Sequence, residues 1–402
     1  MKKLADRVFL LCAAAALLSV PALTLARVSA RQSLYYENRT LADKPAWDWE
    51  AVLEGDWFSG WEAWYSDRVP GRTTLLRLTA KADLDLLKRP VVNDVVVSGD
   101  KLLPFLPYGR WDTRVHRTNA EPFAEDLGAF SRRVEELGGR FWFVGIPEQG
   151  PYFYDHYPPE LENRRWNSTA ANAAFFQALE DHGVAYVDME AVYDAQGRPE
   201  AYYSAVDHHY RWRGALAAYE AVLDRINGDA GWALPVMREA DLNIRALPNP
   251  YLGSRNRKLY GLWPSEERAE IGELKQPIPF TRKDDGQACG AEVYALPGSE
   301  EQLVTYGLYM GGDHGETVIR TNRPELPNAL IFGDSFTNAM ETLLYTSFNE
   351  TRSLDLRYYE EKSLREYVEE YRPEVVLCVR DNTAFYTSGG NARVWTDETP
   401  GA

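Results

Sequence analysis

The sequence predicts an α/β protein built on a parallel sheet with helices on both faces. From residue 121 onward, stretches with helical spacing of apolar residues alternate with short apolar runs typical of strands. Two polar motifs, Gly333-Asp334-Ser335 and Asp207-His208-His209, stand just ahead of expected helices. Strands that alternate with helices pair in parallel, because a parallel connection has to cross the whole sheet.

The expected elements follow in a regular order. Helices are expected over 121–137, 170–182, 214–226, 337–347 and 362–371. Strands are expected over 140–146, 184–189, 329–332, 353–357 and 374–379. Ahead of them, residues 31–60 read as irregular, 60–87 as helical and 91–106 as short strands with turns at Asn93-Asp94 and Gly99-Asp100.

Residues 229–328 interrupt this alternation with Pro, Gly and short β-like runs at 292–296 and 302–309. We interpret them as an insertion of hairpins and loops between two halves of the domain. The chain then divides into an N-terminal segment (1–30), a helical extension (31–100) and an α/β domain (101–395) that holds the insertion at about 229–328.

The N-terminal segment has the pattern of an export signal. Lys2, Lys3 and Arg7 precede an apolar run over 8–26, and Val28-Ser29-Ala30 offers small residues for cleavage. The run contains Pro21 and lies at the lower limit for spanning a bilayer, so we favour a cleaved signal peptide over a retained anchor. In either case the rest of the chain is expected outside the cytoplasm.

Composition narrows the class of protein further. The net charge of −16 disfavours nucleic acid and bare anionic membranes as partners. Three cysteines in 402 residues do not make a disulfide-stapled protein, and we expect no bridge between Cys289 and Cys378. No CxxC pair indicates a zinc site. The 12 Trp and 24 Tyr fit either a core or stacking on sugar rings.

Ser335 is a candidate nucleophile. A serine between a strand and a helix is exposed at the carboxyl end of the sheet, beside the first backbone N–H groups of the helix. An oxyanion that forms next to that serine can be stabilised there. The alternative is that Asp334 or Ser335 only caps the helix.

Asp207 and His209 are a candidate orienting carboxylate and general base. In an extended segment residues two apart point the same way, so Asp207 pairs with His209 while His208 points elsewhere. Surface histidines in a loop are one alternative. A metal site built from His208, His209, Asp313 and His314 is the other.

These motifs resemble a known family. Gly333-Asp334-Ser335 matches the nucleophile block of SGNH hydrolases, and Asp207-His208-His209-Tyr210 resembles the signature of the DHHW family, which is related to exported alginate O-acetylating proteins. Further stretches that resemble this family are Gly214-Ala215, Ala218-Tyr219, 37–42 with Pro45, 67–72, 93–95, 310–315 and 355–359. Tyr210 stands where the family name has Trp, and Arg211 where a small residue is usual.

The resemblance implies an SGNH/flavodoxin-like sheet with a circularly permuted motif order, because the serine follows the Asp and His in the chain. It implies catalysis by Ser335, His209 and Asp207 without a cofactor or metal, surrounded by Tyr210, His208 and Asp334. The implied reaction is O-acetylation of an extracellular or cell-wall polysaccharide, with a multipass membrane O-acyltransferase as acetyl supplier. A carbohydrate acetylesterase and a non-catalytic polysaccharide-binding or assembly protein are the alternatives.

The groups that would contact the oxyanion or the substrate are less sharply predicted. Gly312, Asp313 and His314 form one candidate loop, since glycines let the backbone approach a ligand, although a plain glycine-rich turn fits equally. Gln149 follows the strand at 140–146 and would emerge at the same edge. Arg380 follows the last strand and would hold an acidic sugar or pair with Asp381.

Overall fold

In the computed structural model, residues 2–26, 33–34, 36, 39–385 and 393–394 are described. The predicted cleavage residues Val28-Ser29-Ala30 and the first two residues of the 37–42 stretch lie outside them. The chain forms two compact units, residues 1–95 with 256–264 and residues 96–255 with 265–402.

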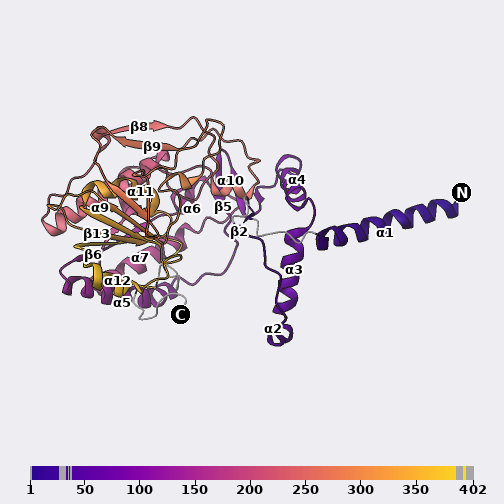
Figure 1. The fold of residues 1–402 in the computed structure, drawn as a ribbon, viewed down its shortest axis with the longest axis horizontal. Coiled ribbons are helices and arrows are strands. Elements are labelled where there is room, and N and C mark those ends of the chain that lie inside the picture. The colour runs from indigo at the N-terminus through magenta and orange to yellow at the C-terminus, as the bar shows by residue number, and fades with distance from the viewer. Residues whose placement is uncertain (1, 27–32, 35, 37–38, 386–392, 395–402) are drawn as a thin grey trace. The chain divides into compact units, whose positions relative to one another are not determined.

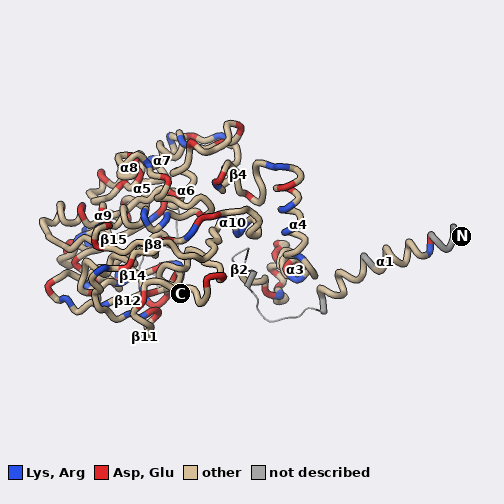
Figure 2. Tube along the Cα trace, turned by 90° about the horizontal axis from the view of Figure 1, so that it is seen from above, with Lys and Arg blue, Asp and Glu red and all other residues tan. Residues whose placement is uncertain are grey.

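The first unit consists mainly of helices. It contains α1 (Lys2–Ala26), β1 (Ser33–Leu34) paired antiparallel with β2 (Arg39–Thr40), α2 (Trp49–Glu54), α3 (Asp56–Arg68), α4 (Arg72–Asp85) and β3 (Val91–Val92). Within α1, Asp6–Thr24 is long and apolar enough to cross a membrane, a property that signal sequences share. Figure 2 shows α1 uncharged over most of its length.

Two expectations for this unit are corrected. Residues 31–60 are not irregular throughout, because α2 begins at Trp49 with Asp48 accepting a hydrogen bond from the Glu50 amide at 3.0 Å. The helix expected over 60–87 is two helices. Pro70 lacks the N–H that a continuing helix needs, and Gly71 has a φ of 72°, so the chain turns between α3 and α4.

The second unit is organised around an eight-stranded sheet with the order β11-β10-β12-β14-β13-β15-β6-β7. Five neighbouring strands run parallel: β14 (Glu350–Leu354), β13 (Ala329–Gly333), β15 (Val375–Asp381), β6 (Arg140–Ile146) and β7 (Ala185–Asp188). Their carboxyl ends meet at one edge, which is where ligands bind in open α/β sheets. The predicted α/β class with a mostly parallel sheet is confirmed.

Helices cover both faces of this sheet (Figure 1). One face packs on α5 (Val115–Glu136), α7 (Arg165–Asp181) and α12 (Leu364–Tyr371), where alternate strand residues such as Phe141, Phe143 and Phe332 form the core. The other face packs on α8 (Met189–Ala195), α9 (Trp212–Ala230) and α11 (Thr337–Leu344). This alternation explains why the central strands read as continuous apolar runs: both of their faces are buried.

The segment expected as a separate insertion partly extends the main sheet. β10 (Thr281–Asp284), β11 (Gln287–Cys289) and β12 (Glu316–Arg320) join it as an antiparallel edge, while β8 (Leu242–Ala246) and β9 (Glu270–Leu274) form their own antiparallel pair. The β-like runs at 292–296 and 302–309 are not strands and make only isolated bridges, Tyr294 to Tyr309 and Tyr251 to Val304. Pro297-Gly298 and Gly307 interrupt the pairing that a strand needs.

The strand expected over 353–357 is displaced. β14 ends at Leu354, because the Asp355 carboxylate accepts the Arg357 amide at 3.0 Å and turns the chain. The remaining elements are β4 (Val95–Ser98), β5 (Lys101–Pro104), α6 (Gln149–Tyr152), α10 (Ser254–Lys258) and five short 3₁₀ turns at Tyr154–His156, Glu200–Tyr202, Glu239–Asp241, Tyr306–Leu308 and Tyr345–Ser347.

Candidate active site

Ser335, His209 and Asp207 form one hydrogen-bonded chain at the carboxyl edge of the sheet. His209 Nε2 lies 2.8 Å from Ser335 Oγ, and His209 Nδ1 lies 2.7 Å from Asp207 Oδ1. Asp207 and His209 are 2% and 4% exposed, whereas Ser335 is half-buried. A buried carboxylate and imidazole behind a reachable hydroxyl is the arrangement that lets a serine lose its proton during attack.

The turn that presents Ser335 is shaped by the two residues before it. A Cβ on Gly333 would lie 2.1 Å from the Val379 carbonyl oxygen, so only glycine lets β13 and β15 approach this closely. The Asp334 carboxylate accepts the Phe336 amide at 3.0 Å and the Asp381 amide at 2.9 Å. Ser335 is no helix cap, because the residue at the start of α11 is Phe336 and no side chain caps it.

Asp207 and His209 lie on a tight turn rather than on an extended segment. Ser204 Oγ accepts the amides of Val206 and Asp207 at 3.1 and 2.9 Å, and the Ser204 amide donates to the His209 carbonyl at 3.3 Å. The expectation that His208 points away is therefore wrong. Its ring centroid lies 3.7 Å from that of His209, and its Nδ1 is 2.7 Å from Ser254 Oγ.

Ser254 holds the carboxylate from the other side. Its amide donates to Asp207 Oδ2 at 2.6 Å, while Oδ1 receives the His209 backbone amide at 3.1 Å. Burial by itself would raise the pKa of Asp207. The neighbouring His209 and His208 and the Ser254 amide outweigh burial and hold that pKa well below its usual range. Asp207 is accordingly a carboxylate whose charge can stabilise a protonated His209.

A second carboxyl beneath the turn behaves in the opposite way. Burial and the neighbouring Asp381 carboxylate raise the pKa of Asp334. Its oxygens accept the backbone amides of Phe336 and Asp381, so Asp334 fixes the serine turn.

Two aromatic rings enclose the imidazole. Tyr306 lies flat on the His209 ring, with centroids 3.7 Å apart and planes inclined by 4°. The Tyr210 hydroxyl donates to the Phe336 carbonyl and so connects the histidine turn to the serine turn. Tyr210 thus serves as a buried hydrogen-bond donor. No sequence signal marked Tyr306, since it comes from the segment between β11 and β12 and meets His209 only in the fold.

A buried ion pair borders the same turn. Arg255, next to Ser254, pairs with Glu148, whose other carboxylate oxygen accepts the Gly150 amide at 2.8 Å. Burial raises the pKa of Glu148, and Arg255 counteracts that rise. Sequence reasoning missed this pair because its members lie far apart in the chain.

The metal-site alternative divides into two parts. Ligand atoms of Asp207, His208 and His209 lie within 4.8 Å of one another, a spacing that could hold a cation. Both ring nitrogens of His209 are, however, already in contact with Asp207 and Ser335. Within the described chain, Asp313 and His314 do not join this group: Asp313 accepts from Asn338 at 2.9 Å, and His314 lies 3.3 Å from the Met310 carbonyl.

The residues predicted to contact the oxyanion or the substrate do not gather in one place in the structure. Gly312, Asp313 and His314 line a small hollow against α11 whose lining includes neither Ser335 nor His209. Gln149 is fully buried and donates both amide hydrogens, to the carbonyls of Leu102 and Ser204. Arg380 donates to the Ala384 carbonyl and lies over the Phe123 ring rather than pairing with Asp381.

Asn382 is a further polar group at this edge. It follows β15, its Oδ1 accepts the Glu148 amide at 3.0 Å, and its buried Nδ2 has no hydrogen-bond partner among the described residues. An unpaired buried donor is costly unless a ligand or water satisfies it. The sequence placed Asn382 in a run after the last strand, but nothing distinguished it from Arg380.

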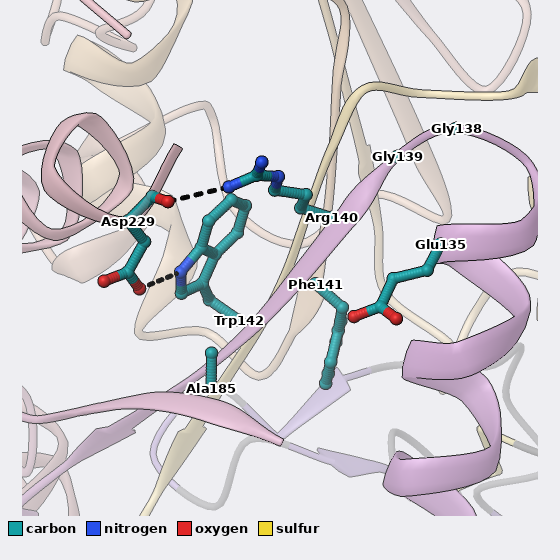
Figure 3. A pocket seen from close by; sticks show the side chains of 8 residues that line it. All are labelled: Glu135, Gly138, Gly139, Arg140, Phe141, Trp142, Ala185 and Asp229. Carbon is teal, nitrogen blue, oxygen red and sulfur yellow. Dashed lines mark hydrogen bonds between the residues drawn. The ribbon is translucent and has the colours of Figure 1, made fainter. Parts of the chain in front are cut away.

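A wider hollow lies at the opposite, amino edge of the sheet (Figure 3). Its polar groups are largely paired with one another: Arg140 donates to the Asp229 carbonyl at 2.8 Å, and Trp142 Nε1 donates to Asp229 Oδ2 at 2.9 Å. This hollow therefore presents no set of convergent reactive groups comparable to the serine turn.

The fold and the contacts among Ser335, His209 and Asp207 are similar to those of SGNH hydrolase-like domains. Residues 108–246 match the family model described as SGNH hydrolase-like domain, acetyltransferase AlgX. The resemblance seen in the sequence is thereby confirmed for the domain. The matched range contains Asp207 and His209 and ends before Ser335. No curated protein matches the chain.

Two solved structures share the fold. PatB1 of Bacillus cereus, solved with a sulfonyl adduct, is 22% identical with a TM-score of 0.63, over 76% of this chain and 100% of that chain. A DHHW family protein from Eubacterium siraeum is 20% identical with a TM-score of 0.57, over 76% of this chain and 95% of that one. At these identities the similarity establishes the shared fold.

Proposed function

We propose that this chain is an exported O-acetyltransferase that carries acetyl groups on Ser335 and delivers them to a polysaccharide. The observation that carries the proposal is the continuous hydrogen-bonded path from Ser335 Oγ through His209 to the buried Asp207 carboxylate. The acetyltransferase named in the matching family model supports the choice of acyl group. The apolar segment Asp6–Thr24 supports export or anchoring at the membrane.

In the first half-reaction Ser335 Oγ attacks the acetyl carbonyl while His209 Nε2 takes the hydroxyl proton. The bond to the donor's leaving group breaks, the leaving group receives that proton, and the acetyl ester of Ser335 remains. Asp207 keeps Nδ1 of His209 protonated and stabilises the imidazolium that forms. The Ser335 amide and Asn382 Nδ2 are the proposed donors to the oxyanion.

In the second half-reaction a sugar hydroxyl replaces the donor. His209 takes the proton of that hydroxyl, the sugar oxygen attacks the acetyl carbonyl, and Ser335 Oγ leaves with the proton returned to it. A multipass membrane O-acyltransferase is the proposed source of the acetyl group. Water in place of the sugar would make the same site an acetylesterase, so the acceptor decides between the two activities.

The test is a pair of assays on the full chain with an activated acetyl ester as donor and an oligosaccharide as acceptor. Acetyl on the sugar, measured by mass spectrometry, reports transfer, and free acetate reports hydrolysis. Ser335→Ala should lose both, while the exposed Ser66→Ala should lose neither. Full activity of Ser335→Ala would refute the serine mechanism, and acetate without acetylated sugar would refute the transferase.

Covalent labelling gives a second readout that needs no acceptor. Because PatB1 has been solved with a sulfonyl adduct, phenylmethanesulfonyl fluoride is the matching probe. It should add one sulfonyl group to the chain, on the peptide that contains Ser335, and Ser335→Ala should remain unlabelled. Labelling at another residue with Ser335 unmodified would contradict an activated Ser335.

A further inference from the structure

The unit that follows α1 exposes an unusual amount of apolar surface. Among the described residues outside α1, eight of the fifteen large apolar side chains that are exposed fall between residues 47 and 87. They are Trp47, Trp49, Leu53, Phe58, Leu75, Leu78, Leu86 and Leu87. The α/β unit, which is almost three times as long as the first unit, contributes the other seven. Four of the eight lie in or beside α2 and the other four in or just after α4, and clusters of exposed apolar side chains on a folded protein mark interaction surfaces.

The cluster beside α2 is built on a group of aromatic rings. Trp47 lies edge-to-face with Trp49 at 5.2 Å and with Trp57 at 5.1 Å, and Trp57 continues to Phe58 at 5.2 Å. Trp47, Trp49 and Phe58 are 61%, 66% and 58% exposed. We call these three residues the tryptophan surface. Their mutual packing holds the rings in place although water covers most of their area.

Two observations identify a lipid surface as its partner, and a third decides its charge. The tryptophan surface begins about 20 residues after a segment able to span a membrane. Residues 43–62, which surround the tryptophan surface, carry one Lys and six Asp/Glu, so the lipid headgroups that suit it are zwitterionic and not anionic. Exposed Trp is the residue type enriched at the membrane–water interface.

An exposed leucine beside the tryptophan surface separates a lipid surface from a glycan. Aromatic rings stack on sugars, but Leu53, one helical turn after Trp49 in α2 and 85% exposed, has no flat face for such stacking. Acyl chains accept both aromatic and aliphatic side chains. We propose that α1, whose sequence pattern by itself favours a cleaved signal, stays in the membrane as an anchor, and that the tryptophan surface inserts at the level of the lipid headgroups, so that the catalytic unit is held close to the bilayer.

The test uses the full chain in phosphatidylcholine vesicles whose acyl chains carry bromine near the headgroup. Bromine quenches indole fluorescence only at short range, so it reports tryptophans that enter the bilayer. Trp47→Ser/Trp49→Ser should lower the bromine-quenchable emission by about half or more, since these are the most exposed indoles of the unit. The control is Trp166→Ser, which removes an indole that is 50% exposed in α7 and should change nothing.

Two results would overturn the inference. One is equal quenching in the double variant and the Trp166→Ser control. The other is protection of Trp47 and Trp49 from acrylamide in water without bromine quenching, since a protein partner or a second copy would then cover them. Flotation of the wild-type chain with the vesicles checks the anchor separately. The double variant should still hydrolyse a soluble acetyl ester, which shows that it is folded. If the wild-type chain does not hydrolyse this ester, the result contradicts the proposed function and leaves the membrane contact unaffected.

Discussion

Tyr306 lies parallel to the His209 imidazole, with ring centroids 3.7 Å apart, and comes from a 3₁₀ turn almost a hundred residues away in the chain. Phe336, the residue after the serine, contacts the imidazole at 4.9 Å. His209 can therefore rotate about its side-chain bonds only if Tyr306 moves. We infer that Tyr306 keeps Nε2 directed at Ser335 Oγ.

Replacing Tyr306 tests this positioning role. Tyr306→Leu should lower kcat for acetyl transfer about fivefold, because a ring contact of this kind is worth roughly 1 kcal/mol. Tyr306→Phe keeps the ring and should stay within about twofold of wild type. Steady-state kinetics measure both, and KM should change less than kcat. Equal kcat in the Leu and Phe variants would show that the stacked ring does not position His209.

Asp207→Asn tests the orienting carboxylate. The Asn side chain can present an N–H to Nδ1 and so favours the imidazole tautomer that cannot take a proton at Nε2. The expected loss of kcat is about 10³-fold or more, the range seen for the corresponding change in serine proteases. Binding of an oligosaccharide should be unaffected, which a direct binding measurement checks. Wild-type kcat in this variant would exclude the proposed base.

The Glu148–Arg255 pair should matter for stability more than for chemistry. Arg255→Met leaves a buried carboxylate without its cation and should destabilise the fold by about 3 kcal/mol. The double variant Arg255→Met/Glu148→Gln removes both charges and should recover much of that loss. Urea unfolding of the two single variants and the double variant measures the coupling. Additive losses would mean that the pair does not interact in the folded protein.

Glu341 should make stability depend on pH. This α11 residue is 6% exposed and accepts the Ser353 hydroxyl at 2.7 Å, and burial raises its pKa above the ordinary 4.5. The folded state thus binds a proton that the unfolded state releases. The contribution of Glu341 to stability is present below pH 4.5 and is lost as pH rises through the raised pKa.

Thermal unfolding at a series of pH values measures this effect. Wild type should lose stability relative to Glu341→Gln as pH rises from about 4.5 toward neutrality, because the Gln variant carries no charge to bury. The exposed Glu300→Gln serves as the control and should follow wild type. Parallel curves for wild type and Glu341→Gln would contradict the raised pKa.

Short sequence patterns predicted much of the fold because strand and turn preferences depend on residues that are neighbours in the chain. The strand at 140–146 was predicted at its observed bounds, since β-branched and aromatic residues between Gly138-Gly139 and Pro147 leave little choice. The segment between residues 229 and 328 was predicted poorly. Among its strands β11 lies at the edge of the sheet with all three residues exposed, and β10 and β11 belong to the sheet only because β12 pairs with β14.

The sequence by itself determined that a serine follows one buried strand and that an Asp-x-His motif precedes a helix, because short-range turn and helix chemistry is encoded locally. It could not determine which groups surround them. Tyr306, Ser254 and the Glu148–Arg255 pair reach the site from distant segments, and such contacts depend on the order of strands in the sheet. The tertiary structure decided these neighbours, since packing joins residues by distance in space and not by distance along the chain.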